Sequence, residues 1–333
     1  MVLSRNTVAG RRGWLSLAAA CALTSASFGV HSEDYDVRLA PAFTGPQVTS
    51  AHFNAAERAG DRIVVAGQSG IILYSDDEAA TWKQAEVPVS LALTGVAFAD
   101  ELNGWAVGHD LLILHTIDGG ESWEVQHFDP EMDMPLLDVW FRDTREGFAI
   151  GSRGYVFHTT DGGKHWDLTE VFTNDDLVPD AHLFSMTATK SGNLFMTAEV
   201  GALFRSEDDG QTWEQLESPY NGSFFGVAYP CEKRLVAYAM LGNAAVSDDG
   251  GETWVRNDFP VKRSMLNSWE LDDGTLVVMG LAGRIVVSKD CGQTFVDRSL
   301  EEQIDLTAGL PLKDGRWLFT TTEGLITTEL DLN

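Results

Sequence analysis

Three of the chain's pairs of adjacent aspartates are the first residues whose type and spacing suggest chemistry, because carboxylate oxygens are the ligands that calcium prefers. The pairs are Asp76-Asp77, Asp208-Asp209 and Asp248-Asp249. Each pair falls inside a short phrase that recurs along the chain, where one Asp side chain can cap the backbone amides of a tight turn while its neighbour faces solvent. We therefore interpret these aspartates as structural and expect no metal site.

Other residue patterns that carry chemistry are missing from the sequence. The eight histidines are scattered, and none pairs with another at the spacing of metal ligands. There is no GxSxG nucleophile motif, no phosphate-binding loop and no dinucleotide fingerprint. We expect a protein without catalytic residues and without a cofactor.

The recurring phrase fits the pattern S/T-x-D-x-G-x-S/T-W. Its six copies are SDDEAATW (75–82), TIDGGESW (116–123), TTDGGKHW (159–166), SEDDGQTW (206–213), SDDGGETW (247–254) and SKDCGQTF (288–295). We expect each copy to form a β-hairpin turn with a capping Asp, a residue at φ > 0 and a ring packed against the sheet. The expected capping residues are Asp77, Asp118, Asp161, Asp208, Asp249 and Asp290, and the expected rings are Trp82, Trp123, Trp166, Trp213, Trp254 and Phe295.

The closing rings lie 41, 43, 47, 41 and 41 residues apart, and a period near forty residues is typical of a repeat architecture. Apolar runs and tight turns precede each phrase, as in LTGVAFAD (93–100) and GWAVGHDLLILHT (104–116), so each unit supplies four antiparallel strands with the phrase between the third and the fourth. Such units must stack around an axis, which predicts an all-β, seven-bladed β-propeller. The tail 305–333 would form the last blade, closed by an N-terminal strand near Tyr35–Pro41.

The first 32 residues have the features of a signal peptide, because three arginines precede an apolar stretch and no acidic residue comes before Glu33. We expect an exported, periplasmic protein whose single propeller domain covers 33–333 and contains no membrane-spanning segment once the signal is removed. The adjacent Arg11 and Arg12 leave open whether export uses the twin-arginine or the general route.

Three cysteines occur in the chain. Cys21 could be lipidated and anchor the protein on a membrane surface, but we favour a cysteine within a discarded signal. An exported protein can form a disulfide, here between Cys231 and Cys291. We expect Cys231 on an inner hairpin and Cys291 on an outer one, however, which would leave two free, buried thiols.

The chain is strongly acidic. Its formal net charge is −27, and the part from Glu33 onward carries −30 because the preceding segment holds three arginines and no acidic residue. Nucleic acids and anionic lipids bind basic surfaces, so neither is expected as a ligand, whereas a basic protein partner is favoured. The acidity could equally serve only to keep an exported monomer in solution.

The recurring phrase resembles the Asp-box of BNR repeats, which is known from sialidases. This resemblance raises the alternative of a glycosidase or carbohydrate-binding propeller. Sialidases carry an Arg-Ile-Pro phrase before the first box, which this chain lacks, and their nucleophile is a tyrosine, of which the chain has six. The arginines also do not fall at matching places in successive blades. The box alone therefore does not favour catalysis.

The whole repeat resembles the photosystem II stability/assembly factor family of exported seven-bladed propellers. The likeness is clearest in LTGVAFADELNGWAVGHDLLILHTIDGGESWE (93–124) and LLDVWFRDTREGFAIGSRGYVFHTTDGGKHWD (136–167). It implies a non-catalytic protein that holds a membrane-associated client while a complex is assembled. Members of the photosynthetic lineage present an arginine-rich patch to the client, whereas the only close group here is Arg142, Arg145 and Arg153.

In a four-strand meander the first–second and third–fourth hairpins share one face of the ring, and the second–third hairpins occupy the other. The second–third hairpins differ from blade to blade, as a recognition surface would, and we predict the binding site there. The predicted binding residues are Gln68, His109, Arg153, Glu199, Asn243, Arg284 and Glu323.

Two long loops, 127–136 and 171–182, are expected to border the same face. They carry the apolar residues Phe128, Met132, Met134, Phe172 and Leu177. These side chains could grip a peptide or fold back on the blades.

Overall fold

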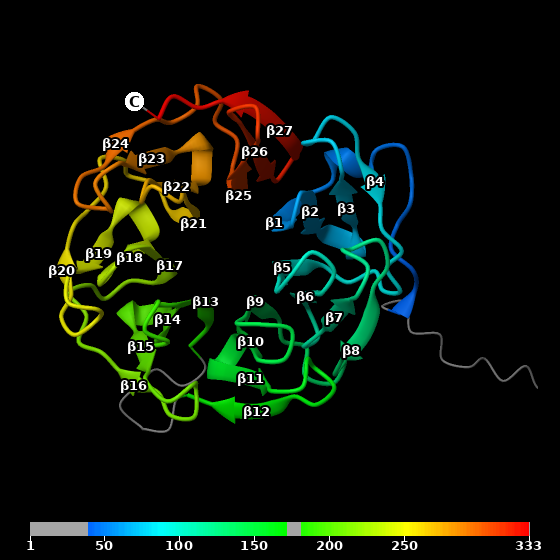
Figure 1. Ribbon diagram of the computed structural model, residues 1–333, viewed down its shortest axis with the longest axis horizontal. Coiled ribbons are helices and arrows are strands. Elements are labelled where there is room, and N and C mark those ends of the chain that lie inside the picture. The colour runs from blue at the N-terminus through cyan, green and yellow to red at the C-terminus, as the bar shows by residue number, and fades with distance from the viewer. Residues whose placement is uncertain (1–38, 172–180, 333) are drawn as a thin grey trace, which may run out of the picture. The chain divides into compact units, whose positions relative to one another are not determined.

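The computed structural model describes residues 39–171 and 181–332. They belong to one compact unit, residues 36–333. This unit consists of seven small antiparallel sheets placed around an axis, which confirms the predicted all-β, seven-bladed propeller (Figure 1). The predicted signal, with Arg11, Arg12 and Cys21, lies outside the described residues.

The blades follow one another along the chain, and each strand pairs with its neighbours in sequence. Blades 1 to 3 contain β1 (Phe53–Ala59), β2 (Arg62–Gly67), β3 (Ile72–Ser75), β4 (Lys83–Gln84), β5 (Leu93–Phe98), β6 (Gly104–Gly108), β7 (Ile113–Thr116), β8 (Glu124–His127), β9 (Leu136–Phe141), β10 (Gly147–Gly151), β11 (Tyr155–Thr159) and β12 (Asp167–Glu170). Blades 4 to 6 contain β13 (Leu183–Ala188), β14 (Leu194–Ala198), β15 (Leu203–Ser206), β16 (Glu214–Gln215), β17 (Phe224–Cys231), β18 (Arg234–Ala239), β19 (Ala244–Ser247), β20 (Val255–Arg256), β21 (Met265–Glu270), β22 (Leu276–Gly280), β23 (Ile285–Ser288) and β24 (Val296–Asp297). Blade 7 contains β25 (Leu306–Pro311), β26 (Arg316–Thr321) and β27 (Gly324–Glu329).

The hydrophobic core lies between the blades. Second strands such as β14 and β22 are buried along their whole length, because a neighbouring blade covers each of their faces. This burial explains why they read as continuous apolar runs and do not alternate with polar residues. The core between blades 5 and 6, for example, combines Val236 and Tyr238 of β18 with Val278 of β22 and Val286 of β23.

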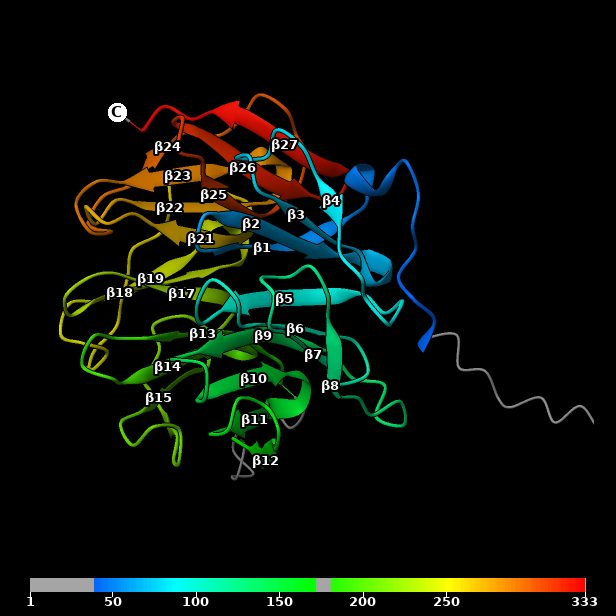
Figure 2. The same cartoon turned by 45° about the vertical axis from the view of Figure 1, so that its right-hand side comes forward.

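The first strand of every blade stands at the hub of the ring. Contacts run from β1 to β5 and onward through β9, β13, β17, β21 and β25 back to β1, so the circle is closed. Figure 2, turned by 45°, shows β1 and β5 side by side. Within the described part of the chain no helix is long and apolar enough to cross a membrane.

The predicted N-terminal strand of blade 7 is not found among the described residues. Residues 39–41 form no strand, Tyr35 to Arg38 lie outside the described ranges, and the sheet of blade 7 has three strands. The chain instead passes along blade 1, where the Ala42 amide donates a hydrogen bond to the Val87 carbonyl (3.0 Å).

Side chains join blade 7 to blade 1. The hydroxyl of Thr307 donates to the carbonyl of Phe53 (2.6 Å), and the Arg58 guanidinium bonds both Glu78 (3.0 Å) and the carbonyl of Pro311 (2.8 Å). Apolar side chains of β2 and β3 pack against those of β25 and β26 beneath these bonds. We call this junction the seam.

Candidate functional site

The Asp-box turns form the hydrogen bonds expected of a capping carboxylate. In blade 5, Asp249 accepts the amide of Thr253 at Oδ1 (2.9 Å) and the Thr253 hydroxyl at Oδ2 (2.6 Å). The Ser247 hydroxyl donates to the same carboxylate (2.7 Å) and accepts the amide of Gly251 (2.8 Å). The other five boxes repeat this arrangement, with His165 replacing the hydroxyl in blade 3.

These bonds hold the carboxylates in their charged form. A hydrogen bond from His165 lowers the pKa of Asp161 to about 2. Partial burial would raise the pKa of Asp249, but the hydrogen bonds from Thr253 and Ser247 outweigh it, and this pKa is also about 2. The ring of Trp254 is buried, and its Nε1 donates to the Gly251 carbonyl (3.2 Å).

Each box also contacts the preceding blade. Gly251, at φ +96°, lies so close to Phe195 of blade 4 that a side chain would not fit. Arginines of preceding blades reach across to the boxes: Arg205 pairs with Glu252 (2.6 Å), and Arg234 donates to the Gly292 carbonyl (2.8 Å). The boxes therefore fasten neighbouring blades together.

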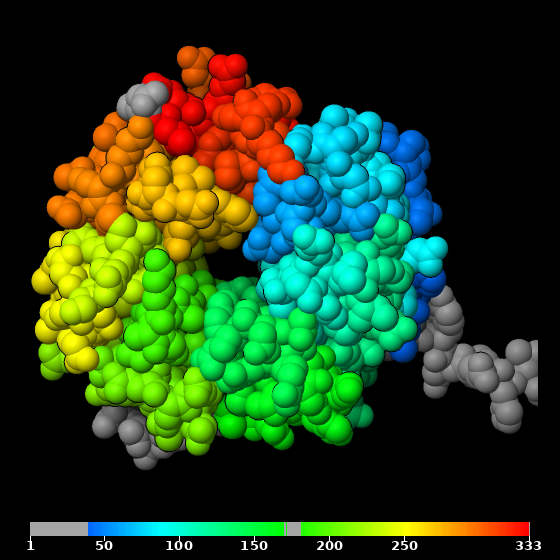
Figure 3. Space-filling view, in the orientation of Figure 1, coloured from blue at the N-terminus to red at the C-terminus, as the bar shows by residue number. Residues whose placement is uncertain are grey.

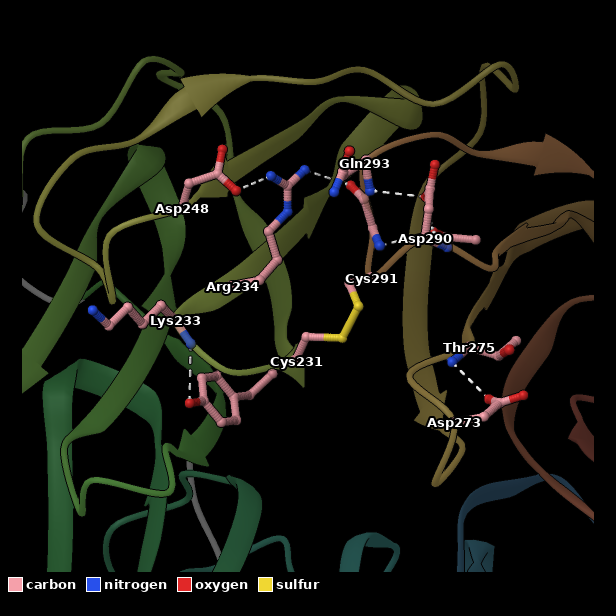
Figure 4. Close-up of a disulfide and its surroundings, with 12 residues drawn as sticks. Cys231, Lys233, Arg234, Asp248, Asp273, Thr275, Asp290, Cys291 and Gln293 are labelled. Atoms are coloured by element: carbon pink, nitrogen blue, oxygen red, sulfur yellow. Dashed lines mark hydrogen bonds and ion pairs between the residues drawn. A yellow bond between two sulfur atoms is a disulfide. The ribbon is translucent and has the colours of Figure 1, made fainter.

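The expectation of two free thiols is wrong, because Cys231 and Cys291 form a disulfide with their Cα atoms 5.6 Å apart (Figure 4). Cys231 ends β17 of blade 5, and Cys291 lies in the Asp-box of blade 6. The error came from comparing the two hairpins as if they belonged to one blade. First–second hairpins and boxes share a face, and a box leans over the blade before it.

The seven predicted binding residues all lie on the opposite face, in or beside the turns between second and third strands. We call this the turn face. Gln68, His109, Arg153 and Glu323 are exposed, and Glu199, Asn243 and Arg284 are half-buried. Most of these turns are short 3-10 segments, and each contacts the first strand of the next blade. None of the seven lines the central channel described below, so the structure does not gather them into one pocket.

The close group of arginines is divided between the two faces. Arg142 and Arg145 lie in the hairpin before β10, whereas Arg153 lies in the turn after it. Arg142 is paired with Glu146 (3.0 Å) and Asp209 (2.8 Å). Proximity in sequence was therefore a poor guide to a basic patch.

A different basic group forms on the turn face. Arg284 lines a small cavity of about 240 Å³ together with Lys262, Arg263 and Asp297. Lys262 and Arg263 come from the connection between blades 5 and 6, and only the fold brings them to Arg284.

The loop 127–136 folds back on the blades. Met134 is buried, Phe128 packs against the core between blades 1 and 2, and Met132 packs against the core between blades 2 and 3. Phe172 and Leu177 lie outside the described residues.

A channel of about 390 Å³ runs along the axis and is lined by the first strands of the blades. Figure 3 shows the opening at the centre of the ring. Near the turn face every first strand carries a β-bulge, where one residue has no partner on the second strand. The seven bulge residues all line the channel; they are Asn54, Thr94, Leu137, Phe184, Phe225, Leu266 and Thr307.

The bulge residues divide into a polar and an apolar half. Asn54, Thr94 and Thr307, in blades 1, 2 and 7, each donate a hydrogen bond to a carbonyl of the next blade's first strand. Blades 3 to 6 present Leu137, Phe184, Phe225 and Leu266, which we call the apolar arc. The backbone position is the same in all blades, so the difference in chemistry comes from the side chains alone.

Three carboxylic acids line the channel: Glu57 of blade 1, Asp138 of blade 3 and Glu270 of blade 6. Burial raises the pKa of Glu57 to about 7 against the hydrogen bond from the Arg58 amide, and it raises the pKa of Asp138 to about 6 against those from Met186 and Val139. Burial also raises the pKa of Glu270, which accepts the Tyr229 amide (2.6 Å).

No sequence pattern pointed to this acidic channel, because its members stand alone in apolar strands. In residues 39–171 and 181–332, no three His, Cys, Asp or Glu side chains converge as metal ligands do.

Seven blades and six Asp-box turns define a β-propeller of the Asp-box type. The chain belongs to the family described as Photosynthesis system II assembly factor YCF48, whose profile matches residues 77–258. The resemblance seen in the repeat is thereby confirmed.

Curated relatives match part of the chain. It is 35% identical over 168 residues to the photosystem II assembly protein Ycf48 of Synechococcus sp. (strain JA-3-3Ab), covering 47% of this chain and 48% of the relative. It is 37% identical over 164 residues to the photosystem II assembly lipoprotein Ycf48 of Prochlorococcus marinus, covering 49% and 47%. The chain thus spans about half the length of the curated relatives it matches.

Solved structures share the fold over most of the ring. A structure of YCF48 bound to D1 peptide has a TM-score of 0.67 at 20% identity, covering 85% of this chain and 94% of that one. YCF48 from Cyanidioschyzon merolae also has a TM-score of 0.67, at 14% identity, covering 86% and 97%.

Proposed function

We propose that this protein is a non-catalytic assembly factor, a monomer that holds a segment of a membrane-associated client protein while a larger complex is put together. The observation that carries the proposal is the match to the YCF48 family over residues 77–258, more than half of the chain. A propeller of that family has been solved with a D1 peptide, which supports a peptide segment as the type of ligand.

We place the client on the turn face, at the mouth of the channel. The opposite face carries the boxes, whose side chains are engaged in fastening the blades. At the channel mouth, equivalent positions carry unlike side chains, and the half-buried apolar arc offers contact area beside polar groups. Such variation on a fixed frame is what recognition requires.

The glycosidase alternative has less support. A sialidase-type site needs an arginine cluster for the substrate carboxylate. No arginine is among the described residues that line the channel. We therefore assign its carboxylic acids no catalytic role.

Site-specific crosslinking in cells tests the proposal. A photoreactive amino acid replacing Phe225 at the channel mouth should capture a membrane protein or its precursor, whereas the same group replacing Asp272, exposed on the box face, should not. Equal capture at both positions, or none at Phe225, would overturn the proposed surface. Turnover of sialosides or glucans that disappears in a Glu57→Gln variant would overturn the non-catalytic assignment.

We also propose export to the periplasm, on the basis of residues 1–32. The lipoprotein names of the Prochlorococcus and Parasynechococcus relatives support the alternative in which Cys21 is lipidated. The intact mass of the mature protein distinguishes the two alternatives. Lipidation would leave Cys21 as a diacylglycerol-modified N-terminus, whereas ordinary cleavage near Ser32 would remove Cys21.

A further inference from the structure

The apolar arc continues onto the surrounding turn face. The turns of blades 4 and 5 expose Val200, Met240 and Leu241, with 46%, 36% and 58% of their surface accessible. These turns contact the first strands β17 and β21, which carry Phe225 and Leu266 of the arc. On the turn face of blades 4 and 5, exposed apolar side chains therefore adjoin the channel mouth.

The turns between second and third strands share a strained backbone, because Ser69, Arg153 and Ala282 also have positive φ at the equivalent place. Val200 and Leu241 have φ of +52° and +58°, in the left-handed region that non-glycine residues, and β-branched ones above all, adopt reluctantly. Apolar side chains held in strained, solvent-exposed turns gain nothing from burial within this chain. A ligand that covers them would supply that burial.

The channel behind the arc carries only negative charge. In the part of the chain that the structure describes, its titratable lining residues are Glu57, Asp138, Glu270 and Tyr238, with no Lys, Arg or His among them. A cationic group on the turn face, Lys262 with Arg263 and Arg284, lines a separate cavity. The register of β9 places Asp138 near the turn face and that of β1 places Glu57 deeper, whereas Glu270 ends β21 at the exposed box-face end of the channel.

The cavity suits a side chain and not a folded module. Its volume of about 390 Å³ lies at the lower end of the range of about 300–1,000 Å³ that ligand pockets cover. An ion alone is disfavoured, because no three acidic groups among the described residues converge on a point. A long, flexible cation with an apolar stem matches both the depth and the charge.

We propose that the axial channel receives a lysine or arginine side chain from an extended segment of the client, whose neighbouring apolar side chains rest on the apolar arc. This inference builds on the proposed function and specifies the client's chemistry. The cation contacts Asp138 first and then Glu57, in surroundings where water screens poorly and an ion pair is strong. Apolar contacts around the mouth exclude water from the pair.

A cation bound in the channel stabilises the ionised form of the channel acids, which burial disfavours. Because the pKa of Glu57 is about 7 and that of Asp138 about 6, binding of a cation near neutral pH releases protons. The affinity for a cationic segment therefore rises with pH between about 5 and 8, and a neutral segment lacks this dependence.

A matched pair of labelled peptides tests the proposal. One carries a single arginine among leucine and phenylalanine residues, and the other carries citrulline, its uncharged analogue, in the same place. The protein without its signal should bind the arginine peptide about tenfold more tightly at pH 8, and the preference should shrink at pH 5. Equal affinities at pH 8 would overturn the proposal without any variant having to fold.

A charge-matched pair of variants locates the effect. Glu57→Gln with Asp138→Asn should abolish the preference for arginine, whereas Glu232→Gln with Asp272→Asn, which removes the same charge from the exposed box face, should retain it. If the Glu57→Gln, Asp138→Asn variant kept the preference for the arginine peptide, the proposal would be overturned. Failure to crosslink from Phe225 in a protein with both channel acids intact would instead refute the client surface on which the proposed function relies, so the two failures are distinguishable.

Discussion

The box carboxylates and the channel carboxylates are the same chemical groups in opposite situations. Each box aspartate accepts several hydrogen bonds at the rim of the ring, and in Asp161, Asp249 and Asp290 the pKa falls to about 2. The channel acids lie among apolar strands, and in Glu57 and Asp138 the pKa rises to about 7 and about 6. In the boxes the hydrogen bonds outweigh the effect of burial on the carboxylate, whereas in the channel burial outweighs the hydrogen bonds.

This difference separates structure from function. A carboxylate with complete partners stabilises the fold and has nothing left to offer a ligand. A carboxylate whose charge is disfavoured makes the folded state less stable, and a ligand of opposite charge can relieve that penalty. Substitutions in each region test this contrast.

The largest effect is expected where a box is covalently tied to its neighbour. Replacing both Cys231 and Cys291 by serine should lower the free energy of unfolding by about 2–4 kcal/mol, because the bond closes a loop of 60 residues. Chemical denaturation of the oxidised protein measures this. If the variant is as stable as the oxidised parent, the hydrogen bonds and apolar contacts of the boxes alone hold blades 5 and 6 together.

An intermediate effect is expected from one box carboxylate. Asp249→Ala leaves the Thr253 amide and two hydroxyls without their acceptor and should lower the free energy of unfolding by about 1–2 kcal/mol. The control is Asp272→Ala, an exposed aspartate in a hairpin on the same face. Similar losses in both variants would contradict a structural role specific to the box.

The channel should respond with the opposite sign. Glu57→Gln keeps an acceptor for the Arg58 amide but removes a charge that burial disfavours, so it should raise stability by about 1 kcal/mol above pH 7. The wild-type pKa is raised from 4.5, so the penalty grows as pH rises from about 4.5 to 7, and the gain should vanish below that window. A gain that persists at about pH 4 would contradict this cause.

The wild-type protein should become less stable in acid, because the box aspartates lose their charge there. Their lowered pKa values mean that this contribution is complete above about pH 4 and is lost as the pH falls towards 2. Thermal unfolding as a function of pH should therefore show a maximum between about 4 and 6. A stability that still increases as the pH falls below this range would exclude the box contribution.

The smallest effect is expected on the turn face. Gln68→Ala and Glu323→Ala alter exposed residues outside the channel and should change the free energy of unfolding by less than about 0.5 kcal/mol. A larger change would mean that these turns also contribute to the fastening of the blades.

Regular repetition made the fold predictable. The six copies of the Asp-box set the period and the apolar runs before each copy give the strands, while the strand-like runs of the tail 305–333 add the seventh blade. The residues that carry the box, such as Asp249 and Trp254, could be named because their spacing is fixed by local hydrogen bonds.

The channel could not be predicted in the same way. Phe184 and Phe225 look like ordinary strand residues, and only their bulges turn them towards the axis. Asp138 and Glu57 lie far apart in the sequence and come to line one channel only through the closure of the ring. The disulfide was missed for the same reason, because the contact between Cys231 and Cys291 belongs to two blades.

The seam has a consequence for how the molecule is made. Six of the seven blade junctions join segments that follow one another, whereas Thr307 and Phe53, which bond across the seam, are separated by 254 residues. The flank of blade 1 that Leu310 and Leu318 cover stays bare until blade 7 has been synthesised. The nascent polypeptide therefore carries an uncovered apolar edge while blades 2 to 6 emerge, and the ring closes only when blade 7 follows them.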